Sequence, residues 1–251
     1  QAEAGIRDAQ ESRGLGDVYK RQVIELNKEV YGREHPNTIA SINNLAYLYL
    51  RDDKPEKAEP RFTLAYDLWR KKFGERHQNT LKALNNLGRV HKNLGNLDTS
   101  EKHLTQALEG RTAIFGKKHA DTLRSMNDLG ELLVLQEKPE EALELFEETL
   151  ELEYEVLGKS HPYTFETLNN LAQLKEDLGL LDEALNSYDR AIQFNPDYAD
   201  AYSNRGAVLQ ELGRLDEAVK SCDKAIPVSY THLRAHETPE QLGCRGLVGK
   251  K

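Results

Sequence analysis

The stretch that decides the fold is His35-Pro36-Asn37-Thr38, followed a few residues later by Asn43-Asn44-Leu45-Ala46. The two motifs return together three more times, with the histidine at His77, His119 and His161. Each step is 42 residues long, and none is shifted. Self-similarity at a fixed period of this length is typical of repeat architectures, in which every repeat is one small supersecondary structure. The chain is therefore predicted to be a repeat protein.

Each 42-residue repeat is predicted to form two helices. In the first repeat, apolar residues recur at the three- and four-residue spacing of one helical face: Ile39, Ile42, Leu45, Ala46 and Tyr49. Pro55 suits the first turn of a second helix, and Gly74 is a helix-terminating residue. That second helix carries its own inward-facing residues, namely Ala58, Phe62, Ala65, Leu68 and Trp69. The pattern indicates an all-α chain of helix-turn-helix repeats.

The period shortens towards the end of the chain. Asn170 and Asn204 occupy equivalent places but lie only 34 residues apart. Asn195-Pro196-Asp197 now joins the helices, where the earlier repeats have a longer linker. We therefore expect about five helical pairs, the last of them in a shorter repeat.

The two repeat lengths resemble one known family. The 34-residue repeat resembles the tetratricopeptide repeat in its small residues Gly206, Gly213, Ala218 and Ala225. The 42-residue repeats, with their His-Pro-Asn-Thr and Asn-Asn-Leu-Ala motifs, resemble the longer variant of kinesin light chains and many bacterial repeat proteins. This resemblance implies a right-handed α-solenoid of tandem helix-turn-helix tetratricopeptide repeats. The sequence departs from the family at Lys175, where an aromatic residue is usual, and at Arg205 and Ser100.

The resemblance covers about residues 23–226. The predicted organisation is an orphan second helix at 23–32, then 42-residue repeats from about 35, 77, 119 and 161, then a 34-residue repeat at about 197–226. Residues 1–22 and 227–251 resemble translated sequencing-adapter read-through, and we expect both segments to be non-native and the array to be part of a longer one. The alternative interpretation is a native capping helix followed by a flexible tail.

Composition argues against several classes of function. The 251 residues carry a formal net charge of -8, which argues against nucleic acid as the main partner. No stretch approaches the roughly 20 apolar residues of a membrane helix, and no secretory signal is visible. Cys222 and Cys244 are the only cysteines, too few for a disulfide framework or a four-cysteine zinc site. We expect a cytoplasmic protein without membrane or nucleic-acid partners.

The evenly spaced histidines, with His35 and His161 each before a proline, invite a metal interpretation. Residues one repeat apart, however, are too distant to share one ion at bonds of about 2 Å. A structural role at the start of each helix is the favoured interpretation. No phosphate-binding glycine loop, nucleophile elbow or His-Glu-x-x-His pair occurs either. We therefore expect no enzyme activity, no cofactor and no metal site.

Binding residues are predicted from the first helices, because the resemblance implies that these line the concave surface. Asparagine is a mediocre helix former, so its recurrence inside helix after helix calls for a reason. Its carboxamide offers both donors and an acceptor and can hold a peptide backbone. The alternative is that one column of asparagines bridges neighbouring helices. The predicted peptide-binding groove comprises Asn43, Asn44, Tyr47, Arg51, Lys82, Asn85, Asn86, Arg89, Lys92, Asn127, Asp128, Glu131, Asn169, Asn170, Gln173 and Asn204.

Charge along this groove is polarised. The early repeats offer Arg51, Lys82, Arg89, Lys92 and Arg124. The later ones offer Glu131, Glu166, Glu176, Asp177, Asp200 and Glu211. Such a gradient would place the acidic part of a ligand near repeats one and two. The alternative is an ordinary solvated face.

The sequence thus predicts a non-enzymatic scaffold that binds a peptide or partner protein in its concave groove. Two alternatives remain. The chain could be a sensor or oligomerisation segment of a larger signalling protein, or an architectural spacer. Self-association through uncapped ends is also expected to be possible.

Overall fold

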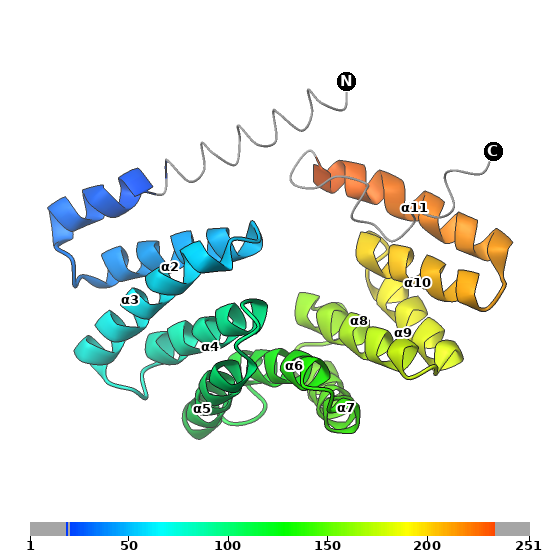
Figure 1. Ribbon diagram of the computed structural model, residues 1–251, viewed down its shortest axis with the longest axis horizontal. Coiled ribbons are helices and arrows are strands. Elements are labelled where there is room, and N and C mark those ends of the chain that lie inside the picture. Colours follow the sequence, from blue (N-terminus) through cyan, green and yellow to red (C-terminus); the bar gives the residue numbers. More distant parts are fainter. Residues whose placement is uncertain (1–18, 20, 234–251) are drawn as a thin grey trace. The chain divides into compact units, whose positions relative to one another are not determined.

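The computed structural model describes residue 19 and residues 21–233 of the chain, with side chains described as far as Ala225 (Figure 1). Within the described residues, all regular structure is helical, as the sequence predicts. The chain divides into two compact units, Gln1–Lys138 and Pro139–Lys251. We call them unit 1 and unit 2 and describe each by itself.

The first run of helical residues in the continuously described part of unit 1 is 21–31, close to the orphan helix predicted at 23–32. The labelled helices follow in order: α2 (Pro36–Arg51), α3 (Pro55–Phe73), α4 (Gln78–Asn93), α5 (Leu97–Phe115) and α6 (Ala120–Leu135). From α2 to α6, each helix packs against the next. The first helices α2, α4 and α6 also contact one another in turn, so they form one continuous layer.

Unit 2 repeats this plan with α7 (Pro139–Val156), α8 (Pro162–Asp177), α9 (Leu181–Phe194), α10 (Ala199–Glu211) and α11 (Leu215–Leu233). Each of these helices packs against the next, and the first helices α8 and α10 touch. The backbone of α11 continues to Leu233, past the predicted end of the array at Ile226. Residues 1–18, 20 and 234–251 lie outside the described residues, so the interpretation of the two terminal segments stays a prediction.

The repeated histidine and threonine join each linker to the helix that follows it. The Nδ1 atom of the histidine accepts a hydrogen bond of 3.2 Å from the backbone N–H two residues later, at His35, His77, His119 and His161. The threonine hydroxyl donates at 2.9–3.0 Å to the carbonyl of the glycine that ends the preceding helix, at Thr38, Thr80, Thr122 and Thr164. These side chains satisfy backbone groups that a helix end leaves unpaired. The predicted structural role of the histidines is confirmed.

The core of each unit is built from the faces that the periodicity predicts. One column of second-helix residues is buried in successive repeats: Phe62, Leu104, Phe146, Tyr188 and Cys222. The paired helices approach closely at Gly88, where a Cβ would lie 2.6 Å from Cδ2 of Leu104 and this side chain would have to shift. Tight packing of paired helices thus fixes the spacing of the repeats and, with it, the place of every first-helix side chain.

Candidate functional site

Two hollows follow the seam between α2 and α4 in unit 1. The first has a volume of about 250 Å³ and lies near the start of both helices. Its polar lining includes Asn37, Asn44, Asn79 and Lys82, while Trp69 of α3 borders it from below the surface. Asn44 and Lys82 are exposed, and neither makes a hydrogen bond or ion pair with the described residues. This hollow therefore presents an amide and a cation that are available to a ligand.

The second hollow, of about 160 Å³, lies near the ends of the same two helices. Its lining combines Tyr47, Arg51, Arg89 and Lys92 with Asn93. Tyr47 is 43% exposed, and the guanidinium of Arg89 lies 5.9 Å from the centre of its ring. The hollow therefore offers an aromatic surface and several cationic groups side by side.

The first asparagine of each Asn-Asn pair, and Asn127 of the equivalent Asn127-Asp128 pair, belongs mostly to the interior. Exposure is 8% or less for Asn43, Asn85, Asn127 and Asn169. The Nδ2 of Asn86 donates to Oδ1 of Asn43 at 3.3 Å, and Asn204 donates to Asn169 in the same way at 3.0 Å. A side chain of one repeat thus holds that of the repeat before it. The bridging role weighed from the sequence is present in both units, whereas the exposed Asn44 stays open to a ligand.

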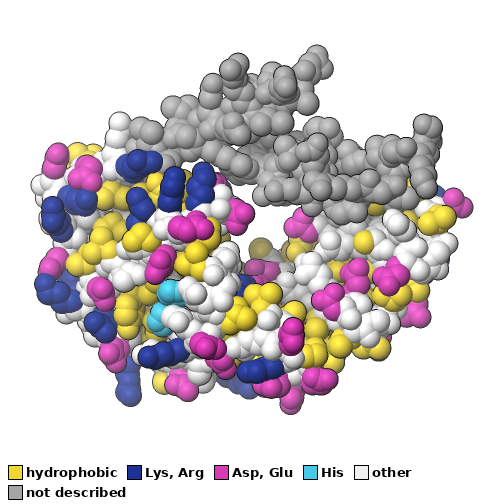
Figure 2. Space-filling view, in the orientation of Figure 1, with side chains coloured by type: hydrophobic (Ala, Val, Ile, Leu, Met, Phe, Trp, Pro, Cys, Tyr) yellow, Lys and Arg dark blue, Asp and Glu magenta, His cyan; other side chains and the backbone are white. Residues whose placement is uncertain are grey.

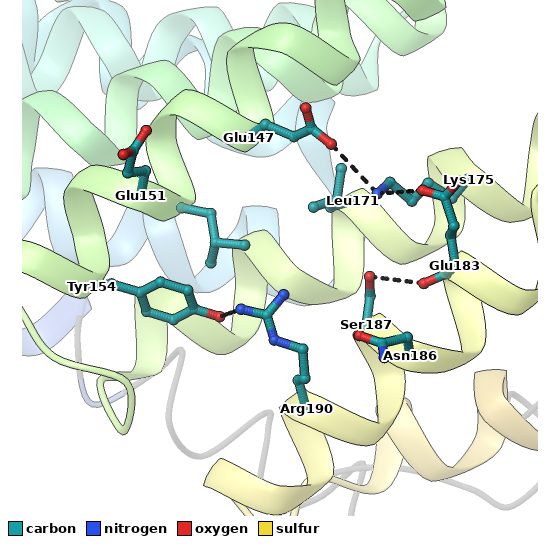
Figure 3. Close-up of a pocket in the computed structure, with 10 residues that line it drawn as sticks. Glu147, Glu151, Tyr154, Leu171, Lys175, Glu183, Asn186, Ser187 and Arg190 are labelled. Carbon is teal, nitrogen blue, oxygen red and sulfur yellow. Dashed lines mark hydrogen bonds and ion pairs between the residues drawn. The ribbon is translucent and has the colours of Figure 1, made fainter.

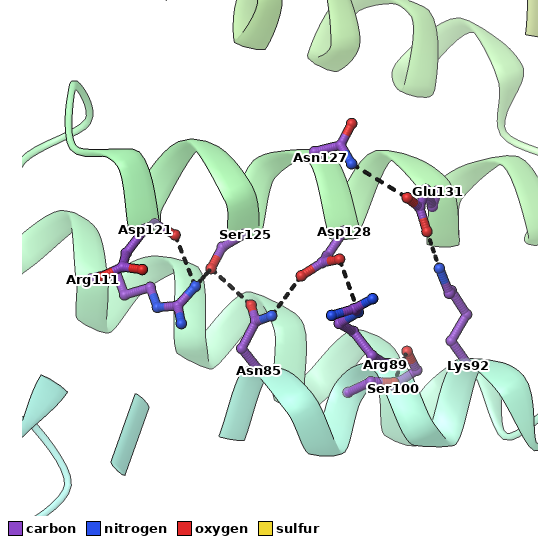
Figure 4. Close-up of polar contacts among 11 residues, drawn as sticks. Asn85, Arg89, Lys92, Ser100, Arg111, Asp121, Ser125, Asn127, Asp128 and Glu131 are labelled. Carbon is purple, nitrogen blue, oxygen red and sulfur yellow. Dashed lines mark hydrogen bonds and ion pairs between the residues drawn. The ribbon is translucent and has the colours of Figure 1, made fainter. Parts of the chain in front are cut away.

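A buried polar network runs from Arg111 of α5 to the groove side of unit 1 (Figure 4). Arg111 donates to the Ser125 hydroxyl at 2.7 Å. Ser125 donates to Oδ1 of Asn85 at 2.8 Å, and Nδ2 of Asn85 donates to Asp128 at 2.5 Å. Asp128 in turn lies 3.3 Å from Nε of Arg89. Because Asp128 is only 2% exposed, this carboxylate is held in place by the protein and fixes the orientation of Arg89. The network ends at Arg89, one of the residues lining the second hollow.

Two predicted groove cations are already paired. Arg89 pairs with Asp128, and the ammonium of Lys92 forms an ion pair with Glu131. Glu131 also accepts a hydrogen bond of 3.3 Å from Asn127. These pairs lower the net positive charge of the second hollow. Lys82 and Arg51 are exposed, and the nearest carboxylate to Arg51, that of Asp52, is 3.8 Å away. Among the predicted groove cations of unit 1, Lys82 and Arg51 are therefore the most available to a ligand.

The predicted site residues of unit 2 lie on α8 and α10. Gln173 is exposed, and Asn170 and Asn204 are half-buried. On α8, burial raises the pKa of Glu176, which accepts a 3.2 Å hydrogen bond from the Tyr188 hydroxyl. Burial also raises the pKa of Tyr188 above its ordinary value. Unit 2 therefore offers amides and carboxylates rather than the cations of unit 1.

Surface charge differs between the two units in the same sense. Lys and Arg side chains are numerous over unit 1, whereas the visible charges of unit 2 are mostly Asp and Glu (Figure 2). In unit 1, α3 carries Lys57, Arg61, Arg70, Lys71 and Lys72. In unit 2, α7 contains no lysine or arginine. The charge polarity predicted along the groove is thus accompanied by a similar polarity on the second helices.

The described part of the chain holds neither a cluster of metal-binding side chains nor a membrane-spanning helix. There, no three or more His, Cys, Asp and Glu side chains come together in a way that could hold a metal ion. Among the same residues, no helix has the length and apolar character needed to cross a bilayer. The hollows of the α2–α4 seam remain the candidate site.

Sequence profiles of the tetratricopeptide repeat match residues 17–71, 40–95 and 79–154, and related profiles match residues 172–213 and 199–228. The first profile alone spans more than half of the chain. The chain belongs to the tetratricopeptide repeat family. Tetratricopeptide repeats generally act as non-enzymatic scaffolds for proteins or peptides. No match was found among curated protein sequences.

Solved structures with the same fold include tetratricopeptide proteins of the kinesin light chain type. BtubC (BKLC) from P. vanneervenii has 18% identity and a TM-score of 0.66, with 93% of this chain and 94% of that chain covered. A putative kinesin light chain of Podosopora anserina with nearly identical TPR-like repeats has 20% identity and a TM-score of 0.59, covering 76% and 91%. MamA has 18% identity and a TM-score of 0.52, covering 72% and 96%. At these identities the likeness shows the fold alone. The predicted resemblance to this kind of tetratricopeptide protein is confirmed.

Some residues of the candidate site were not predicted from the sequence. Asn37 and Asn79 line the first hollow, and Asn93 lines the second. The signal for the first two was present, because both stand inside the His-x-Asn-Thr motif that defines the repeat. The histidine and threonine of this motif make the hydrogen bonds at the helix start, and its asparagine lines the hollow.

Proposed function

We propose that this tetratricopeptide protein is a non-catalytic scaffold whose α2–α4 seam binds an extended acidic segment of a partner protein. The observation that carries the proposal is the pair of hollows along one seam, lined by an unengaged amide and by exposed cations. An extended segment lying along the seam would reach Asn44 and Lys82 in one hollow and Arg51 in the other.

The chemistry of the seam supports an acidic ligand. Lys82 has no carboxylate partner among the described residues, so a ligand carboxylate would supply the missing charge. The Asn44 carboxamide can both donate to and accept from a peptide backbone, which would favour an extended chain without fixing its side chains. Tyr47 supplies an exposed ring for an apolar residue of the segment.

The test uses the whole chain and a fluorescein-labelled peptide of aspartate, serine and leucine, followed by fluorescence anisotropy. We expect the double substitution Arg51→Ala with Lys82→Ala to weaken binding about tenfold and to reduce its dependence on salt. The matched control is Lys57→Ala with Lys102→Ala, which removes the same charge from exposed positions of α3 and α5. The control should change the affinity less than threefold.

The single substitution Asn44→Ala measures the contribution of the amide to binding without changing any charge. A hydrogen bond contributes about 0.5–1.5 kcal/mol net, so we expect a two- to tenfold loss of affinity with unchanged helicity. If the double substitution of Arg51 and Lys82 and its control lower the affinity equally, the effect reflects the overall charge of the protein. That result would contradict the proposal. If no peptide binds but the chain self-associates regardless of these changes, the oligomerisation or spacer alternative is favoured instead.

A further inference from the structure

A cavity of about 290 Å³ lies in unit 2 on the side of its second helices, between α7 and α9 and over α8 (Figure 3). None of the predicted groove residues lines it. Leu150 and Leu171 contribute apolar side chains that are 6% and 3% exposed, and the ring of Tyr154 stands at one end. The cavity therefore has an apolar floor within an otherwise polar surface.

Lys175 of α8 lines the cavity at a position that differs between repeats. The equivalent position of the three preceding repeats holds Tyr49, His91 and Leu133. In unit 2 the ammonium of Lys175 lies 3.4 Å from Glu147 of α7 and 3.0 Å from Glu183 of α9. Both glutamates also line the cavity, so Lys175 links α7 to α9 at its wall.

The cations that line the cavity have partners, whereas one of its carboxylates has none among the described residues. Both of its cations are engaged, since Lys175 is shared by two glutamates and Nη2 of Arg190 donates to the Tyr154 hydroxyl at 2.7 Å. Glu151, by contrast, is an exposed carboxylate of the lining without a hydrogen bond or ion pair among the described residues. The other exposed charges of α7 are also negative, at Glu140, Glu141, Glu144, Glu148 and Glu155. An approaching cation is attracted here, and an anion is repelled.

The geometry points to a second binding site, in which this cavity accepts a lysine or arginine side chain from a basic segment of a partner protein. The aliphatic stem would lie on Leu150 and Leu171, as long basic side chains commonly do on apolar surface. The charged head would reach Glu147 and Glu151 in charge-assisted hydrogen bonds. A protein segment suits the site better than a small cation, because α7 presents carboxylates along its whole length of roughly 27 Å. This site is separate from the α2–α4 seam and does not depend on the function proposed for it.

The test measures binding of a fluorescein-labelled peptide of lysine, serine and leucine to the whole chain by fluorescence anisotropy at low salt. A peptide with glutamate in place of lysine serves as the ligand control and should not bind. Glu147→Gln with Glu151→Gln should weaken binding of the lysine peptide at least tenfold. The matched control is Glu140→Gln with Glu144→Gln, which makes the same charge change at exposed positions of α7 outside the cavity lining. This control should alter the affinity less than threefold.

A steric variant tests the cavity without changing charge. Asn186 is exposed and lines the cavity, so Asn186→Phe should fill it and weaken binding at least tenfold with unchanged circular dichroism. Three results would overturn the inference. These are no binding to the unchanged chain, equal losses in the two glutamate pairs, or full affinity in Asn186→Phe. Because Arg51 and Lys82 lie outside this cavity, their substitution should leave lysine-peptide binding unaltered.

Discussion

Helices α5 and α7 occupy the same place in successive repeats, and each carries a buried ionisable side chain at the equivalent position. Arg111 of α5 is 3% exposed, and Glu153 of α7 is 0% exposed. Arg111 donates to the Asp121 carbonyl at 2.8 Å and to the Ser125 hydroxyl at 2.7 Å (Figure 4). Neither carboxylate oxygen of Glu153 has a hydrogen bond of good geometry within the described part of the chain.

The difference comes from what a helix interface can offer. Carbonyls and hydroxyls accept hydrogen bonds readily, and a guanidinium has five donors to give them. An ionised carboxylate only accepts, and helix backbone N–H groups are already used. Burial accordingly raises the pKa of Glu153 to about 7, and the nearby Thr167 hydroxyl offsets this only in part. One repeat position can thus be buried and charged at little cost with Arg, and at a larger cost with Glu.

The largest effect is expected from Arg111→Ala. The substitution leaves a cavity, and it removes the donor that holds Ser125 and the Asp121 carbonyl. Lost hydrogen bonds to a charged group and lost packing together suggest a decrease of about 3 kcal/mol in the free energy of unfolding. Urea denaturation measures it. Glu109→Ala, at an exposed position of the same helix, should change the value by less than about 0.5 kcal/mol. If Arg111→Ala lowers the free energy of unfolding by less than about 1 kcal/mol, the hydrogen bonds of Arg111 contribute little to stability.

The opposite sign is expected for Glu153→Gln. The folded pKa of Glu153 is raised from 4.5 to about 7, so the unfolded state loses its proton first as the pH rises. The unfolding free energy should therefore fall between about pH 4.5 and pH 7, by up to about 3 kcal/mol, and level off above that range. Glu153→Gln stays neutral, so it should stabilise the protein by about 2–3 kcal/mol at pH 8 and change little at pH 4.

Urea titrations at the two pH values measure this difference. Glu151→Gln is the matched control, because it makes the same chemical change at an exposed position of α7 and should show no such pH dependence. Stabilisation that is equal at pH 4 and pH 8 would contradict the assigned titration. It would show that the amide packs better for reasons unrelated to the proton.

The sequence was sufficient for the fold but only partly so for the candidate site. Periodicity identifies the buried faces, and the strict 42-residue step makes the equivalence of Arg111 and Glu153 visible. It does not show whether a partner stands opposite each of them. That depends on single side chains such as Ser125, and on the exact distance between packed helices.

The Asn-Asn pair shows the same limit at the groove. Both asparagines recur together, and their types alone do not say which faces a ligand. Packing decides it, since Asn43 is 8% exposed and is held by Asn86, while the adjacent Asn44 is exposed. The equivalent Asn86 is 5% exposed because it donates to Asn43 of the preceding repeat, so the place of an asparagine in the pair does not by itself decide whether it is available.

The smallest effect compares equivalent asparagines of the two units. Asn85 accepts from Ser125 and donates to Asp128, whereas Asn169 accepts from Asn204. We expect Asn85→Ala to lower the free energy of unfolding by about 2 kcal/mol and Asn169→Ala by about 1 kcal/mol, because a net hydrogen bond contributes about 1 kcal/mol. A double-mutant cycle between Asn85→Ala and Ser125→Ala should then show coupling. If the two losses are equal and the cycle is additive, Asn85 is a simple bridge between repeats. The contrast between the two units then rests on Arg111 and Glu153 alone, because the chain from Ser125 to Arg89 adds no stability of its own.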